Sequence, residues 1–363
     1  MSEVVAEVRP EPVAPPPVRP PRRRGVAVAA GAALLVAGAV LLWVALVPAG
    51  GLGNLLKLLL VLAAIGLAGQ GVRRIGAGIR GGEFDAGFWL SIAWLAGLAA
   101  AAALADLLPL GNATDTTQTI GQAGYATPDL LSAHPLGTNG FGLDLLARSV
   151  YGARVSLLTV GLTVAVSLLV GGTIGMVAGY FRRSVDLVIG VFADAALVIP
   201  ALVLLIAFAA VLGPPTTVGE AVLKNGLALA VVGIPTMIRL ARANTMVYAQ
   251  REFVLASRAM GAKHLRVLRR EILPNVALPL VSYAFIVAAV LIVAEGSLAF
   301  LGLGLQQPEP SWGNMVAEGG LRELRQHPHV PLVPGAFMFL TVYSLNVVGE
   351  RARARWDSRE VKV

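Results

Sequence analysis

The chain has 363 residues, of which 56% are hydrophobic and only 14% are charged, and its formal net charge is +8. A soluble domain of this length needs a charged surface, so the composition excludes an ordinary soluble protein and favours a bilayer as solvent. The basic residues stand between apolar runs rather than in one block, which argues against nucleic-acid binding. Because the sequence has no cysteine, disulfides and thiolate–metal sites are excluded as well.

The first 24 residues are rich in proline and end in three arginines, a composition typical of a disordered cytoplasmic tail. The apolar run that follows has the basic flank of a signal peptide. A signal peptide, however, has an apolar core of about 7–15 residues, and this run is longer. We therefore predict a retained tail at 1–24 and two N-terminal transmembrane helices within 25–87.

Apolar runs continue along the chain, each close to the length of about 20 residues that one membrane crossing needs. They span 25–47, 55–70, 88–108, 155–177, 187–212, 227–238, 276–303 and 331–348. The sixth is short, and we expect it to extend to Tyr248. The sequence thus predicts an all-α polytopic membrane protein with about eight transmembrane helices, two N-terminal and six in a core at 88–355.

The 29 lysines and arginines indicate the direction of these crossings. With a cytoplasmic N-terminus and eight crossings, most of these residues fall in segments on the cytoplasmic side. This distribution agrees with the positive-inside rule. A seven-helix topology would place the basic loops outside. We therefore expect both termini to be cytoplasmic, with the loop 109–152 outside, the loop 249–274 inside and a cytoplasmic tail at 356–363.

The loop 249–274 is too charged to cross a membrane, yet it carries apolar residues at helical spacing. A first stripe consists of Phe253, Ala256, Ser257 and Met260. A second stripe consists of Leu265, Leu268 and Ile272. Gly261 separates the two stripes, and Pro274 is expected to end the second. Two short amphipathic helices joined at a glycine could dock on a partner protein or anchor to anionic lipid, and the spacing alone leaves both open.

This loop resembles the EAA loop of ABC importer permeases, the segment that docks into the ATPase subunit. The positions that match the family pattern are Leu255, Ala256, Ser257, Gly261, Leu273 and Pro274. The resemblance implies an ATPase-coupling role for these residues and for their apolar neighbours Phe253, Met260 and Leu265. Leu255 stands where the family has an acidic residue, so the resemblance implies the helix–glycine–helix geometry but no charged contact from that position.

Further stretches resemble the C-type permease subunit of dipeptide and oligopeptide importers. They are LGTNGFGLD at 136–144 with YGARVSL at 151–157, and the segments 178–181, 297–304 and 310–315. In the first stretch Asn139 replaces an aspartate of the family, and Leu143 replaces an arginine. The resemblance covers 88–355 and assigns no role to the two helices within 25–87.

The resemblance implies a permease subunit of a binding-protein-dependent peptide importer in the bacterial inner membrane. Its partners would be a second related permease, ATPase subunits that bind ATP and magnesium, and an extracytoplasmic binding protein. The chain itself has no Gly-Lys pair and hence no P-loop, so we expect no catalysis and no cofactor in it. Nickel or glutathione importers of the same family stay open as alternatives, as does, more distantly, an ion-coupled secondary transporter.

Two carboxylates, Asp194 and Glu295, lie inside apolar runs, where an acid is costly and marks either a functional site or a structural pair. A stripe of small residues in the fourth run consists of Gly171, Gly175 and Gly179. Such a stripe lets another helix approach closely, within the subunit or from a partner. His327 and His329 alone make an incomplete metal site, so we expect no metal.

Overall fold

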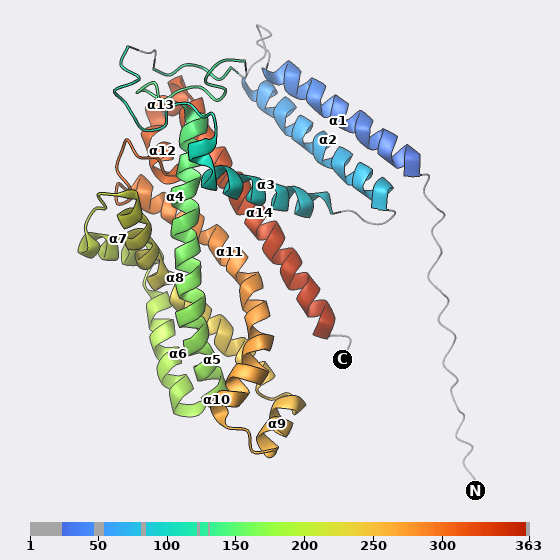
Figure 1. Cartoon of the computed structure of the whole chain (residues 1–363), viewed down its shortest axis with the longest axis vertical. Coiled ribbons are helices and arrows are strands. Elements are labelled where there is room, and N and C mark those ends of the chain that lie inside the picture. The colour runs from blue at the N-terminus through green and yellow to red at the C-terminus, as the bar shows by residue number, and fades with distance from the viewer. Residues whose placement is uncertain (1–23, 47–53, 81–84, 122–123, 130, 361–363) are drawn as a thin grey trace. The chain divides into compact units, whose positions relative to one another are not determined.

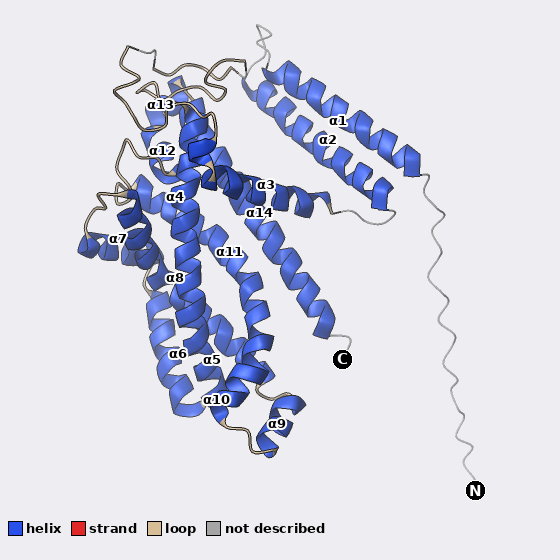
Figure 2. Ribbon diagram, in the orientation of Figure 1, coloured by secondary structure: helices blue, strands red, loops and turns tan. Residues whose placement is uncertain are grey.

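The computed structural model describes residues 24–46, 54–80, 85–121, 124–129 and 131–360, and the regular elements within these ranges are helices (Figures 1 and 2). The chain divides into two compact units, Met1–Gly87 and Phe88–Val363. The tail predicted at 1–24 lies outside the described residues except for Arg24. The tail predicted at 356–363 is helical as far as Glu360.

The described part of the first unit is a hairpin of two helices, α1 (Arg24–Leu46) and α2 (Asn54–Arg80). A Cβ on Gly31 would lie 2.7 Å from the carbonyl oxygen of Gly71, and a Cβ on Gly71 would lie 2.8 Å from that of Gly31. Glycine at both positions therefore lets the two backbones touch, as small residues do between membrane helices.

The described residues of the second unit contain five helical segments that are long and apolar enough to cross a membrane. Three of them are single helices: α3 (Ala86–Ala103), α8 (Val218–Tyr248) and α14 (His329–Glu360). The other two are continuous rods of three elements each. One consists of α4 (Leu145–Val166), η2 (Ser167–Gly171) and α5 (Gly172–Phe181), and the other of α10 (His264–Val267), η3 (Leu268–Ile272) and α11 (Leu273–Phe300). A sixth crossing results if α6 (Arg183–Val198) and α7 (Ala201–Leu212) form one broken span. The short helices η1 (Ala105–Leu107), α9 (Glu252–Ala259), α12 (Trp312–Glu318) and α13 (Leu321–Gln326) lie between these spans.

Among the described residues, fewer than the eight predicted helices are long and apolar enough to cross a membrane. In the first unit α1 contributes a shorter apolar stretch, Val28–Leu41. Its partner α2 carries Arg73 and Arg74 in its second half, which lowers the mean hydropathy there. The six-helix core predicted from the sequence is matched when α6 and α7 are taken as one broken span.

The run 187–212, predicted as one crossing, is broken into α6 and α7, which meet at 91°. Ile199 is extended, with φ −70° and ψ 127°, and Pro200 follows it. A proline lacks the backbone donor that would continue a helix, and it disfavours the helical region for the residue before it. Pro200 in the sequence indicates a break in the helix at this point, but the bend between α6 and α7 is larger than that of a simple proline kink.

The glycine stripe packs α5 against α8 of the same chain. A Cβ on Gly171 would lie 2.6 Å from the carbonyl oxygen of Ile234, and one on Gly179 would lie 2.6 Å from that of Arg242. A Cβ on Gly175 would overlap the carbonyl oxygen of Ile238. The three glycines thus hold two membrane helices of one subunit at backbone contact.

Replacing Gly175 with alanine should therefore force α5 and α8 apart, at a cost of roughly 1–3 kcal/mol for overpacking. Gly161, on α4, is the matched control, because a Cβ there would meet no atom within 4 Å. Gly161→Ala should be neutral or stabilising by up to about 1 kcal/mol through helix propensity. Thermal unfolding of the two variants in detergent checks this, and equal midpoints would contradict the packing role.

Candidate functional site

The coupling loop, defined here as residues 249–274, connects α8 to α11 at one end of the second unit (Figure 1). It contains α9, the turn 260–263, α10 and η3. The opposite end carries the irregular segment between η1 and α4 and the residues 301–328, which include α12 and α13 (Figure 1). We call these two segments together the cap.

Gly261 ends α9 with a Schellman motif. The amide of Ala262 donates to the carbonyl of Ser257 at 3.1 Å, and the amide of Gly261 donates to that of Arg258 at 3.0 Å. Gly261 has φ +83°, in the left-handed region that favours glycine. The chain reverses here, so the residue that separates the two stripes in the sequence also sets the angle between α9 and α10.

The inner face of the coupling loop is anchored to the bundle by Val254, Val267 and Ile272, whose side chains are fully buried. They pack with Tyr248 and Val276 of the adjoining helices. Leu265, predicted in one stripe with Leu268 and Ile272, is 64% exposed, whereas Ile272 is buried. The π-helical turn η3 shifts the register between α10 and α11, so one regular helical period does not hold from Leu265 to Ile272.

The outer face of α9 is apolar, and the described residues of its own unit leave it exposed. Phe253 and Leu255 are about half exposed, Met260 is 82% exposed, and Ala256 is exposed between them. Ser257 is partly buried at the edge of this face. Contiguous exposed apolar residues of this kind mark a protein or membrane contact, because leaving them in water is unfavourable.

The far end of α5 holds the coupling loop from a second side. The Tyr180 hydroxyl lies 2.9 Å from Nδ1 of His264, and the Phe181 ring lies 5.6 Å from the same imidazole. Arg182, which follows with φ +54°, donates to the carbonyl of Met246 at 3.1 Å. Movement of the coupling loop is therefore linked directly to α5 and α8.

Pro274 does not end the second helix of the loop, contrary to the prediction. It lies in the first turn of α11, after Leu273, and the chain is helical through α10, η3 and α11. The part of the coupling loop from His264 onward and the α11 crossing thus form one continuous rod.

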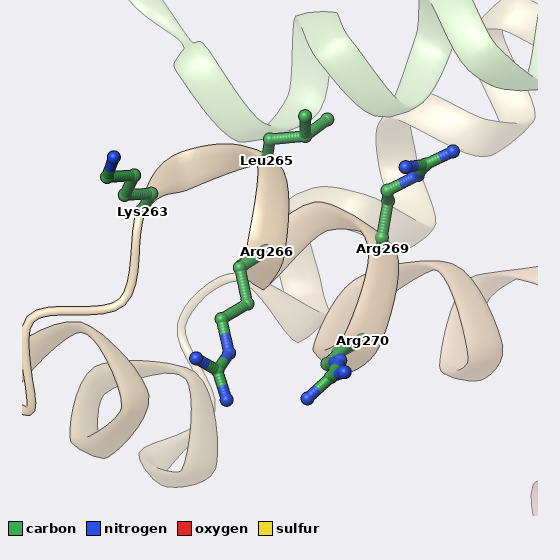
Figure 3. A pocket seen from close by; sticks show the side chains of 5 residues that line it. All are labelled: Lys263, Leu265, Arg266, Arg269 and Arg270. Carbon is green, nitrogen blue, oxygen red and sulfur yellow. The ribbon is translucent and has the colours of Figure 1, made fainter.

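The basic side chains of the loop surround a surface hollow of about 490 Å³ that is lined by Lys263, Leu265, Arg266, Arg269 and Arg270 (Figure 3). Arg266 and Arg270 extend to one side of the helix, whereas Leu265 and Arg269 extend to the other (Figure 3). These cations splay apart rather than converge on one point. The arrangement suits contact with a broad acidic surface better than a single anion site.

The cap is organised around Arg148, whose side chain is 1% exposed. One terminal nitrogen donates to the carbonyls of Ala113 and Pro308, each at 3.0 Å, and the other donates to Glu318 at 3.1 Å. Burial raises the pKa of Glu318, and the Arg148 guanidinium opposes that shift. A single buried cation therefore ties together three segments that are far apart in the sequence.

Asn139 and Leu143, the two departures from the family stretch, lie in one buried turn of the cap. The Asn139 amide nitrogen donates to Glu318 at 2.6 Å, and its oxygen accepts from the amide of Leu143 at 2.9 Å. An aspartate could not donate to Glu318 and would repel it. The departures remove one acid and one base from the same place, so they compensate each other in charge.

Two further contacts fix the ends of the cap. Asp144 caps α4 by accepting from the amide of Ala147 at 2.7 Å, so α4 begins at Leu145 and the end of the loop predicted at 109–152 is helical. The fully buried Trp312 donates to the carbonyl of Ser149 at 3.0 Å. These bonds explain why the stretches 136–144 and 310–315 carry recognisable sequence patterns.

The face of the cap beside α3 is polar. Asp106 accepts from Arg154 and from the Tyr151 hydroxyl, each at 3.0 Å, and these bonds lower the pKa of Asp106. His327 stacks on Tyr125 with ring centroids 4.0 Å apart, and His329 lies 3.3 Å from the carbonyl of Thr138. Within the described residues no group of three or more His, Cys, Asp or Glu side chains is gathered for a metal.

The two intramembrane acids differ in setting. Glu295 is 2% exposed and accepts from Ser156 of α4 at 3.0 Å, so its partner is a neighbouring helix and not the adjoining loop. Asp194 pairs with Arg239 of α8 at 3.0 Å, and both side chains are more than half exposed. Sequence reasoning identified both acids, but it missed both partners, which come from distant parts of the chain.

The chain was compared with known proteins. Residues 171–361 match the family described as binding-protein-dependent transport system inner membrane component. The dipeptide transport system permease protein DppC of Alkalihalophilus pseudofirmus is 36% identical over 227 residues, which cover 62% of this chain and 72% of the relative. The di/tripeptide transport system permease protein DppC of Pseudomonas aeruginosa is 36% identical, covering 62% and 72%. The glutathione transport system permease protein GsiD of Pectobacterium atrosepticum is 34% identical, covering 63% and 73%.

The family match includes the coupling loop and the whole of α8, α11 and α14. These comparisons confirm the family that the motifs indicated. The chain belongs to the binding-protein-dependent transport system inner membrane component family and is a multi-pass membrane permease subunit of an ABC importer.

Proposed function

We propose that this permease moves short peptides into the cytoplasm, driven by ATP hydrolysis in partner subunits that dock on the coupling loop. The observation that carries the proposal is the exposed apolar face of α9, held on the bundle by Val254 and Val267. The substrate class comes from the relatives, whose names specify dipeptides, di/tripeptides and glutathione. All three are small peptides, which favours this class over a metal ion.

We further propose that the coupling loop and both termini face the cytoplasm, and that the cap receives substrate from an extracytoplasmic binding protein. The basic loop supports this direction. In the structure α14 begins beside the cap and runs toward the end that carries the coupling loop (Figure 1). A cysteine placed at Ser358 of this cysteine-free chain should react only with membrane-permeant reagents, and labelling from outside would contradict the orientation.

An uptake assay tests the function. Cells that lack this permease should lose import of labelled di- and tripeptides and regain it with the wild-type gene. An Ala256→Asp variant, which places a charge on the exposed face of α9, is the inactive control. Normal peptide uptake in the deleted strain, together with lost uptake of nickel, would overturn the peptide assignment.

ATP hydrolysis separates the role of this chain from that of its partners. The purified chain should hydrolyse no ATP because it has no P-loop. Activity should appear when the second permease and the ATPase subunits are added. Sustained turnover by the isolated chain would contradict the permease role.

A further inference from the structure

Two ion pairs connect α6 to α8. Nearer the coupling loop, Arg242 binds Asp186 through two nitrogens, and both side chains are partly buried. The Arg242 guanidinium lies over Gly190, which leaves room for it. This bidentate pair has the geometry of a structural tie between two helices.

The second pair, Arg239 with Asp194, has a different character. It is a single contact of 3.0 Å, and the side chains are 65% and 55% exposed. Asp194 lies eleven positions beyond the start of α6 at Arg183, about 16 Å along a helix axis. Asp194 belongs to the broken span of α6 and α7 and Arg239 to α8, both candidate membrane crossings, so this pair is placed at membrane depth. Charges at such a depth face the protein interior or water, because contact with lipid is costly.

The backbone beside this pair is irregular as well. α6 ends at Val198, and the extended residues Ile199 and Pro200 are exposed. Non-helical backbone at membrane depth is tolerated only where protein covers it or where it lines a water-filled cavity. The exposed ion pair and the exposed break therefore lie on a surface of the bundle that is not directed at lipid.

We propose that Asp194 and Arg239 line the substrate path, and that their ion pair opens to bind the charged ends of a peptide. Asp194 would take the terminal ammonium and Arg239 the terminal carboxylate. The ligand class rests on the proposed function. One acid beside one base matches a zwitterion, whereas a metal cation would gain a single carboxylate and be repelled by Arg239. An extended dipeptide spans roughly 7 Å, so the two side chains separate when it binds.

Water access tests the location. In the complete complex, with partner subunits made cysteine-free, Asp194→Cys should react with a water-soluble thiol reagent. Phe192→Cys is the matched control: Phe192 is 74% exposed and lies about 160° around α6 from Asp194. It should not react. No reaction at position 194 in the presence or absence of ATP, or equal reaction at both positions, would overturn the assignment.

Charge removal tests the ligand. A pair that only joins helices can be neutralised on both sides with little effect. A binding pair cannot, so Asp194→Asn with Arg239→Gln should lower dipeptide import about tenfold or more in an assembled complex. The control is Glu220→Gln with Lys224→Gln, which neutralises another ion pair of α8 and should import normally. Wild-type import by the Asp194 and Arg239 double variant would refute the proposal. Absence of dipeptide import by the wild-type complex would refute the proposed function instead, and the labelling result would stand separately.

Discussion

Substituting valine for Gly261 is expected to detach the ATPase subunits from this permease while the membrane helices stay folded. Gly261 has φ +83° at the end of α9. A residue with a Cβ costs about 1–2 kcal/mol more than glycine in this region, and a β-branched residue fits it worst. The strain would misdirect α9 relative to α10. A strain of about 1.4 kcal/mol that raises the free energy of the docked state weakens ATPase binding about tenfold.

Co-purification of the ATPase with tagged permease measures this effect. A Cβ at position 261 would meet no atom within 4 Å, so backbone conformation rather than a clash is tested. Gly261→Asn is therefore the matched control, because asparagine tolerates the left-handed region, and it should retain most of the binding. Equal ATPase recovery with valine, asparagine and glycine would show that the turn does not position the docking helix.

Ala256→Asp probes the same interface by charge instead of geometry. Ala256 is exposed on the face that carries Phe253 and Met260, so the variant should insert and fold. A carboxylate forced into a desolvated contact costs several kcal/mol. If the loop instead anchored to lipid through its cations, loss of Arg266, Arg269 and Arg270 would matter more than either Gly261→Val or Ala256→Asp. The ATPase co-purification with these variants separates the two roles.

The coupling loop shows how far the sequence reached. The glycine turn and the outer apolar residues of α9 could be predicted, because a glycine between two periodic stripes is a local signal. The inner anchors Val254 and Val267 could not, since neither lies in the apolar stripes that the spacing marks, and their burial depends on packing against Tyr248 and Val276 of the adjoining helices. Pro274 was misread because a proline usually ends a helix, whereas here the chain stays helical through η3 and α11.

The ion pairs show what local patterns leave out. Asp194 and Glu295 were visible as acids in apolar runs, but Arg239 and Ser156 became their partners only through the packing of α8 on α6 and of α11 on α4. The sequence likewise gave no reason to link Arg148 with Glu318, 170 positions apart. Pairings of this kind are tertiary, and a single sequence without its relatives does not contain them in readable form.

Replacing Arg148 with methionine is expected to destabilise the cap more than any other single arginine substitution on α4. Methionine fills similar space but leaves Glu318, which is 12% exposed, without its cation, and the carbonyls of Ala113 and Pro308 without their donor. Breaking a buried pair from one side costs about 3–5 kcal/mol. Arg154→Met is the control on the same helix, because its partner Asp106 is 67% exposed and such a pair contributes about 0–1 kcal/mol.

Thermal unfolding in detergent, followed by tryptophan fluorescence, measures both variants, since Trp312 is buried in the cap against α4. A large drop in the midpoint with Arg148→Met and a small one with Arg154→Met is the expected result. Adding Glu318→Gln to Arg148→Met should recover part of the loss, because an amide at position 318 carries no charge to leave unpaired. Equal midpoints for the two methionine variants would mean that Arg148 does not hold the cap together. The expected recovery with Glu318→Gln would show that the unpaired carboxylate of Glu318, and not lost packing volume, causes the destabilisation.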